Sequence, residues 1–188
     1  FVIHEIAEMV ALNMGQYAHG NQPVQHAIYL YNYVGQPWKA QYHTRNVMNK
    51  LYNSGPEGYC GDEDNGQTSA WYVFTALGFY PVCPGASEYV LGSPLFPKAT
   101  LSLPGEKTFT IDAEGVSDTN CYIRSAELNA KGFTRNYLKH EELVGGGEFR
   151  LVMDLSFETD HLFALNAPCV SCRQMACLPQ IDGVNATP

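Results

Sequence analysis

The sequence predicts an α+β protein in which helices come first and antiparallel strands follow. Between residues 2 and 77, apolar residues recur at spacings of three and four, and Gly or Pro interrupts the pattern. From about residue 86, short segments rich in β-branched and aromatic residues alternate with turns rich in Gly, Pro and Asn. We therefore expect a helical part over 1–84, a β-rich part over 85–168, and an irregular tail with cysteines over 169–188.

Composition narrows the class of protein. The chain has 188 residues, 45% of them hydrophobic and 16% charged, which fits a folded globular protein. Its formal net charge of −8, with no basic run, argues against binding of nucleic acid or of an anionic membrane surface. No apolar run approaches the roughly eighteen residues of a transmembrane helix, so no membrane span is expected.

Four helices are expected in the first part. Val2, Ile6 and Met9 form one apolar stripe, and Gly35 and Gly78 end the second and the fourth helix. Helices joined by such short loops predict helix-on-helix packing. Because the chain opens inside the first helix, we expect it to be a fragment of a longer protein. The expected helices cover 2–17, 24–33, 38–52 and 68–77.

Five segments of the second part read as strands. Each combines alternation with β-branched or aromatic residues and is bounded by turn residues. Short strands of this kind, separated by turns, predict an antiparallel arrangement. The segments are EYVLGS (88–93), ATLSLP (99–104), KTFTIDA (107–113), CYIRSAELN (121–129) and EFRLVMDL (148–155).

The stretch over 58–72, GYCGDEDNGQTSAWY, is the strongest candidate for a site. Asp62, Glu63 and Asp64 stand in a row among glycines, directly before an apolar helix. Clustered carboxylates repel one another, and a loop that keeps them close is explained by a bound cation, by proton transfer, or by both. A carboxylate here could act as a general base toward water.

Simpler interpretations of this loop remain open. It could be a solvated acidic turn, or a charge cluster favoured by the positive end of the helix dipole, with Thr68 or Ser69 as the capping residue. An EF-hand is excluded, because the twelfth position, which needs a bidentate Glu, is Val73.

A second polar cluster, HGNQP, covers 19–23 and lies where a helix breaks. The amide oxygens of Asn21 and Gln22 are hard ligands suited to calcium, although a helix-capping role for Asn21 is the simpler alternative. Near the start, His4 and Glu5 form a pair without the HExxH spacing of a zinc protease.

The six cysteines bear on the cellular compartment. Cys169 and Cys172 have metal-ligand spacing, but no fourth ligand matches it, so disulfides in an oxidising compartment or free thiols are favoured over zinc. The other four are Cys60, Cys83, Cys121 and Cys177.

Long blocks carry a resemblance to a known family. HEIAEM, HGNQPVQHAIYLYNYVGQPWKAQ and GYCGDEDNGQTSAWYVFTALGFYPVCPGASEYVLGSPLF resemble the C-terminal part of the calcium-dependent exo-α-mannosidases of glycoside hydrolase family 92. GEKTFTIDAEGVSDTNCYIRSAELNAK continues the likeness, which covers roughly 1–168. It implies the last helices, about four, of an (α/α)6 toroid, followed by an antiparallel β-sandwich-like domain.

The resemblance also implies a chemistry. Family members are inverting enzymes, in which the acidic loop supplies the general base. Asp64 matches the base and Asp62 its partner or alternate. The family's general acid is a Glu that would lie upstream of Phe1, in the rest of the parent chain.

Binding roles follow in the same way. The resemblance places His4 and Glu5 where members that cut α-1,2 linkages contact the leaving-group mannose. It places Asn21 and Gln22 beside the calcium ion. Many members have Glu where this chain has Gln22, which is a departure, because a neutral oxygen binds calcium less strongly than a carboxylate.

The function implied is calcium-dependent, inverting hydrolysis of terminal α-1,2-linked mannose on glycans, by a secreted or periplasmic protein. One alternative is a relative that prefers α-1,3 or α-1,6 linkages or mannose-phosphate diesters. Another, from a different class, is a non-catalytic module that binds glycans or packs against the parent chain. Calcium-dependent mannose binding without product release would favour the module.

Overall fold

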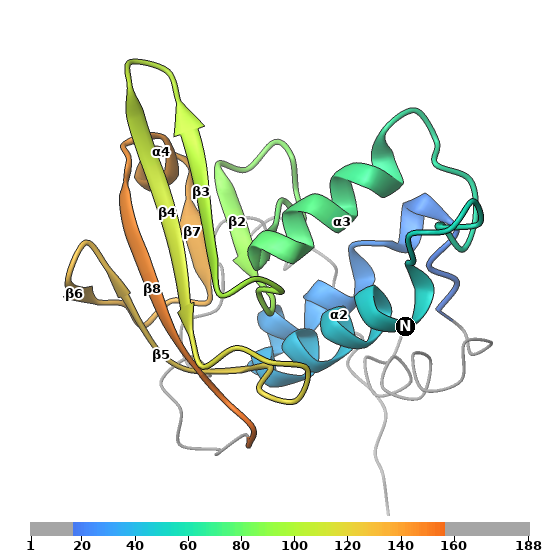
Figure 1. Cartoon of the computed structure of the whole chain (residues 1–188), viewed down its shortest axis with the longest axis horizontal. Coiled ribbons are helices and arrows are strands. Elements are labelled where there is room, and N and C mark those ends of the chain that lie inside the picture. The colour runs from blue at the N-terminus through green and yellow to red at the C-terminus, as the bar shows by residue number, and fades with distance from the viewer. Residues whose placement is uncertain (1–16, 157–188) are drawn as a thin grey trace, which may run out of the picture.

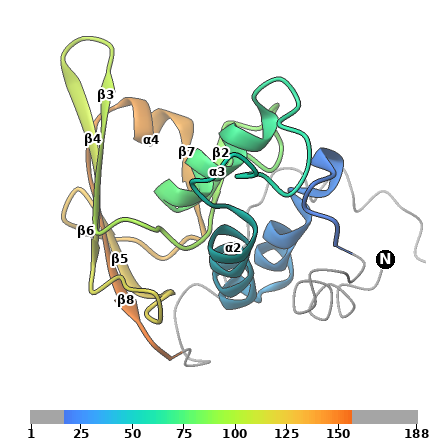
Figure 2. The same cartoon turned by 45° about the vertical axis from the view of Figure 1, so that its right-hand side comes forward.

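The fold comes from a computed structural model that describes residues 17–156. The helices α2 and α3 lie on one side of the molecule and most of the strands, together with the short helix α4, on the other, and the β3–β4 hairpin projects beyond both (Figures 1 and 2). The helical elements are the 3-10 helices η2 (Gln22–Val24) and η3 (Ala27–Val34) and the α-helices α2 (Pro37–Leu51), α3 (Gln67–Leu77) and α4 (His140–Val144). The strands are β1 (Phe79–Tyr80), β2 (Glu88–Leu91), β3 (Lys98–Leu103), β4 (Lys107–Glu114), β5 (Tyr122–Leu128), β6 (Lys131–Gly132), β7 (Tyr137–Lys139) and β8 (Gly147–Asp154).

The third and fourth expected helices are confirmed as α2 and α3. Pro37 occupies the first turn of α2, where its missing N–H costs no hydrogen bond. Gly78 ends α3 in the left-handed conformation, with φ of 96°, which a residue with a side chain adopts only at a cost. The expected helix over 2–17 lies outside the described residues.

The second expected helix, over 24–33, is present as η3, which starts at Ala27 and is a 3-10 helix rather than an α-helix. The short 3-10 helix η2 precedes it, and Gln25 and His26 separate the two. The buried polar groups of η3 bond to distant elements: the Tyr29 hydroxyl donates to Thr75 Oγ1 (2.8 Å), and Asn32 Nδ2 donates to the Leu91 carbonyl (3.2 Å). Such contacts lie outside the local pattern that predicted an α-helix.

The strands form two sheets. A three-stranded antiparallel sheet has the order β1-β2-β7, and a five-stranded sheet has the order β3-β4-β8-β5-β6. All five strand segments expected from the sequence are confirmed. The expectation of purely antiparallel pairing is wrong for one pair, because β4 and β8 run parallel from Phe109↔Gly147 to Glu114↔Val152. Parallel strands need a long crossover, and β5, β6, β7 and α4 supply it.

The boundary expected near Pro84 stays a prediction. Strand β1 precedes that position and pairs with β2, which follows it, through Phe79↔Leu91 and Tyr80↔Val90. The three-stranded sheet therefore draws on both sides of the expected boundary.

Buried polar side chains of α2 bond to the β-rich part. Gln41 Oε1 accepts a hydrogen bond from the backbone N–H of Ile123 (3.0 Å). The Arg45 guanidinium donates to the carbonyls of Ser117 (2.9 Å) and Pro94. Both side chains are at most 4% exposed. These bonds hold the helices, which carry the candidate site, against the sheets.

Candidate active site

The acidic loop lies on the surface immediately before α3. Asp62 and Asp64 are both exposed. Asp64 (φ 56°), Asn65 (φ 55°) and Gly66 (φ 99°) adopt the left-handed conformation in succession. Asp and Asn tolerate this region better than most residues, but it still costs energy, and such conformations cluster at functional sites. The tight turn displays the two aspartates while the chain reverses into the helix.

Glu63, between the two aspartates, has a structural role. Its carboxylate accepts hydrogen bonds from the backbone N–H groups of Gly66 (2.6 Å) and Ser69 (3.2 Å), which are free donors at the start of α3. Bonds from the Ser69 hydroxyl and from these amides hold the pKa of Glu63 below its ordinary value. The expected capping by Thr68 or Ser69 is wrong, since Gly66 is the N-cap residue and makes no side-chain cap.

The HGNQP segment packs directly on the acidic loop. A Cβ placed on Gly20 would lie 2.8 Å from the Cys60 carbonyl oxygen, and one on Gly61 would lie 2.8 Å from the Gly20 Cα. Only glycine at both positions permits this approach of two backbones. Two polar motifs that the sequence separates by some forty residues are therefore neighbours.

Gln22 links these two segments by hydrogen bonds. Its Nε2 donates to the Asp62 carbonyl oxygen (2.7 Å) and to Thr68 Oγ1 (3.3 Å), and the Thr68 hydroxyl donates to the same carbonyl (3.0 Å). A Glu at position 22 could make neither donation, which is a physical reason for an amide here. The sequence analysis considered Thr68 only as a helix cap and missed its bonds to Gln22 and to the Asp62 carbonyl. Its place one turn after the acids was the available signal.

His19 belongs to the interior beneath the site. Its Nδ1 lies 2.8 Å from the Tyr17 hydroxyl and its Nε2 lies 2.7 Å from the Tyr52 hydroxyl. The ring packs edge-on against Trp71, with centroids 4.2 Å apart. Burial lowers the pKa of His19 to about 4, so the imidazole is neutral at pH 7. His19 is a structural residue of this segment.

The donors near the loop agree in kind with calcium. Asn21 is the N-cap residue of η2 without a side-chain cap, and the bonds of Gln22 use its nitrogen, so both amide oxygens can act as acceptors. Oxygen donors of this type, with the carboxylates of Asp62 and Asp64, suit a hard cation. Within residues 17–156, no group of three or more His, Cys, Asp or Glu side chains could hold a metal ion.

The remaining predicted site residues cannot be placed. His4 and Glu5 lie outside the described residues, as do Cys169, Cys172 and Cys177.

The other three cysteines, Cys60, Cys83 and Cys121, are free thiols. Among the described residues, no helix combines the length and apolar character needed to cross a membrane.

The loop therefore presents two exposed aspartates, and the bonds of Glu63 and Gln22 hold its backbone in place. The model of the glycosyl hydrolase family 92 catalytic domain matches residues 2–155. The chain belongs to glycosyl hydrolase family 92, as its sequence resemblance predicted.

Solved structures and a curated relative agree with this assignment. The inverting family 92 mannosidase BT2199 of Bacteroides thetaiotaomicron VPI-5482 is 67% identical, with a TM-score of 0.78, over 89% of this chain and 23% of its own. The family 92 α-mannosidase BT3965 of Bacteroides thetaiotaomicron is 34% identical, with a TM-score of 0.79, over 85% of this chain and 22% of its own. An uncharacterised secreted glycosidase of Arthroderma benhamiae is 29% identical over 81% of this chain and 22% of its own length. The chain thus spans less than a quarter of each of these proteins.

Proposed function

We propose that the chain is part of an inverting, calcium-dependent α-mannosidase that removes terminal α-1,2-linked mannose from glycans. The observation that carries the proposal is the joined pair of motifs: Gln22 and Thr68 hold the Asp62 backbone, and Asp64 follows in a left-handed turn. Family 92 membership and 67% identity to an inverting mannosidase support mannose as the sugar. The α-1,2 linkage rests on the resemblance at His4 and Glu5.

In the proposed reaction, Asp64 takes a proton from a water molecule, whose oxygen then attacks the anomeric carbon. The bond to the leaving oxygen breaks, and that oxygen receives a proton from a general acid upstream of Phe1 in the parent protein. Inverting enzymes hold the two carboxyl groups about 6.5–9.5 Å apart to leave room for the water. Asp62 is the partner that orients the base.

Asn21 and Gln22 are the residues that would hold calcium. The ion would supply charge stabilisation and a template for the sugar hydroxyls. In the same proposal, the helices form the last part of an (α/α)6 toroid, the strands form a β-sandwich-like domain, and the protein is secreted or periplasmic, which the secreted Arthroderma relative supports.

The test is Asp64→Asn in the full-length parent, with α-1,2-mannobiose as substrate. Loss of a general base lowers turnover by about 10²–10⁴-fold. Glu106→Gln, an exposed change in the β3–β4 turn, is the matched control and is expected to keep full activity. Near-normal turnover by Asp64→Asn would assign the base to another residue.

Two further measurements address calcium and completeness. Activity of the parent is expected to vanish in excess chelator and to return with calcium but not with zinc, because the ligands are oxygens. The 188 residues alone are expected not to release mannose, since the acid and most of the enclosing barrel come from elsewhere. Calcium-dependent release by this chain, above an Asp64→Asn control, would show that it holds its own acid.

A further inference from the structure

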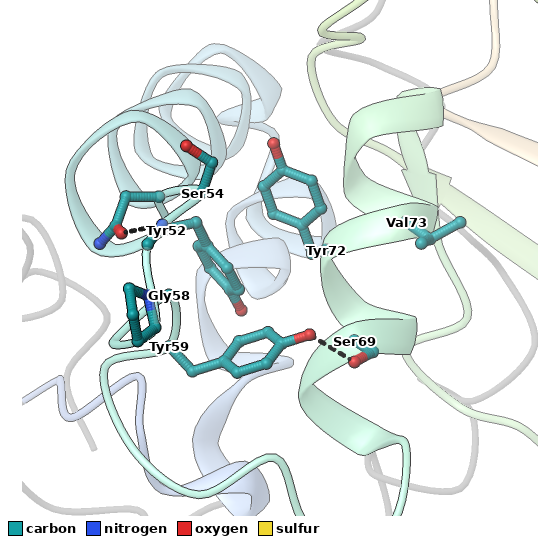
Figure 3. Close-up of a pocket in the computed structure, with 10 residues that line it drawn as sticks. Tyr52, Ser54, Gly58, Tyr59, Ser69, Tyr72 and Val73 are labelled. Atoms are coloured by element: carbon teal, nitrogen blue, oxygen red, sulfur yellow. Dashed lines mark hydrogen bonds between the residues drawn. The ribbon is translucent and has the colours of Figure 1, made fainter.

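A pocket of about 490 Å³ opens beside the acidic loop (Figure 3). It lies between the end of α2, the turn that follows, and the first two turns of α3. The stretch 58–72 supplies part of its wall, but the sequence analysis assigned no ligand to these side chains. Its lining residues are Tyr52, Asn53, Ser54, Gly55, Pro56, Gly58, Tyr59, Ser69, Tyr72 and Val73.

Three tyrosine rings from different parts of the chain meet in this pocket. Tyr52 comes from the end of α2, Tyr59 from the loop and Tyr72 from α3 (Figure 3). The Tyr52 ring lies 5.9 Å from the Tyr59 ring, edge-on at 87°, and 4.7 Å from the Tyr72 ring, tilted at 42°. Tyr59 is 41% exposed, so part of its surface is available to a ligand.

The walls of the pocket are already ordered. The Tyr59 hydroxyl lies 2.7 Å from Ser69 Oγ, which fixes the ring across the gap. Asn53 Oδ1 accepts from the Gly55 N–H (2.8 Å), and its Nδ2 donates to the Glu57 carbonyl (3.2 Å). A preformed pocket binds without a large cost of ordering its own side chains.

The chemistry of the lining indicates a neutral, hydroxyl-rich ligand. None of the ten lining residues carries a charge, and the chain as a whole has a formal net charge of −8, which disfavours phosphate and other anions. Aromatic faces pack against the apolar faces of sugar rings, while hydroxyl groups such as that of Ser54 offer hydrogen bonds to the rim of a sugar. This combination suits a pyranose ring.

We propose that this pocket binds a sugar of the glycan other than the terminal residue held at the acidic loop. The inference rests on the proposed function, because it takes the substrate to be an extended glycan. The pocket and the loop share Ser69: its hydroxyl contacts Tyr59, and its N–H donates to Glu63. A chain of several sugars, cut at the loop, could therefore occupy both places.

The test compares a short and a long glycan in the full-length parent carrying Asp64→Asn, so that binding is measured without turnover. Affinities for α-1,2-mannobiose and α-1,2-mannotetraose are determined by calorimetry. Tyr59→Ala is expected to weaken the tetraose about tenfold, as for one lost stacking contact, and to leave the biose within about twofold. Tyr42→Ala is the matched control, since Tyr42 is 47% exposed on α2 outside the pocket.

A second variant guards against misfolding. Val73 is 57% exposed, so Val73→Arg places a charge in the wall without removing core packing, and it is expected to weaken the tetraose in the same way. Unchanged tetraose affinity in both variants would overturn the pocket proposal alone. If the biose does not bind but tetraose binding still depends on Tyr59, the proposed function is wrong and the pocket stands. Binding of neither sugar overturns both.

Discussion

The interior beneath the helices and the interior of the five-stranded sheet differ in the polarity of their buried side chains. Within residues 17–156, the buried polar side chains other than Ser93 and Asn136 all lie over 19–75. They are His19, Gln25, Asn32, Gln41, His43, Thr44, Arg45, Thr68 and Thr75. The sheet core instead consists of residues such as Phe109, Phe149 and Leu151, which are at most 1% exposed.

This difference indicates which buried positions are most sensitive to substitution. Apolar packing tolerates substitution by residues of similar volume, whereas a buried polar group must meet its partner or lose the free energy of its hydration. Gln25 illustrates this: Nε2 donates to the His19 carbonyl (3.2 Å), Oε1 accepts from Gln67 (3.3 Å), and its backbone carbonyl accepts from Trp71 Nε1 (3.0 Å). The polar interior fixes the segments that carry the candidate site, and the apolar interior stabilises the scaffold.

The largest effect is expected from a cavity in the sheet core. Phe149 is 1% exposed and packs edge-on against Phe133, with ring centroids 5.1 Å apart. Phe149→Ala is expected to lower the free energy of unfolding by about 3–5 kcal/mol, measured by urea titration of the 188-residue chain. Phe96→Ala, at a 48% exposed site, is the control and should cost little. Equal losses would mean that the sheet does not form the core described.

The next effect is a dependence of stability on pH, which arises from two histidines in the interior beneath the helices. Burial lowers the pKa of both His19 and His43 to about 4, with a smaller contribution from Lys39 at His43. As pH falls from 6.5 to 4, the unfolded state gains protons that the folded state does not, so stability falls over this window and levels off below it. Over this window each histidine lowers the free energy of unfolding by about 3 kcal/mol at most, since one unit of pKa shift corresponds to about 1.4 kcal/mol.

Unfolding titrations at pH 7, 5.5 and 4.5 check this expectation. His19→Gln should flatten the pH dependence, while His26→Gln, at an exposed position, should leave it unchanged. If the free energy of unfolding depends on pH equally in both variants, His19 is not a buried, neutral imidazole in the folded chain.

A smaller effect is expected where the polar network meets the acidic loop. Gln22→Glu removes two donated hydrogen bonds and adds a charge beside Asp62, so it should cost about 1 kcal/mol and speed amide exchange over 60–66. Asn65→Asp adds the same charge to the loop without removing those bonds. If both variants exchange equally fast, charge rather than the Gln22 amide controls the loop.

The smallest effect is expected at the surface of the sheet. Arg150 and Glu114 form an ion pair of 2.5 Å, but their side chains are 53% and 57% exposed. Solvent screens such pairs, so Arg150→Ala should leave the unfolding midpoint unchanged within error. Leu151→Ala, one residue along the strand but 1% exposed, should lower it clearly. A clear drop for Arg150→Ala would mean that the pair is shielded from water.

The sequence by itself determined the features that depend on neighbouring residues. Gly78 predicted the end of α3, alternation predicted the strands, and linked motifs predicted the family. These predictions succeeded because capping, turn conformation and side-chain period act within a few residues.

Only the tertiary structure decided what depends on distant partners. It made the second expected helix a 3-10 helix over 27–34, in which Tyr29 and Asn32 bond to Thr75 and Leu91, and it made β4 and β8 parallel. It also brought Gly20 against Gly61, which joined the two motifs of the candidate site. No local pattern contains these contacts, since each forms only when segments far apart in the chain pack together and satisfy one another's buried polar groups.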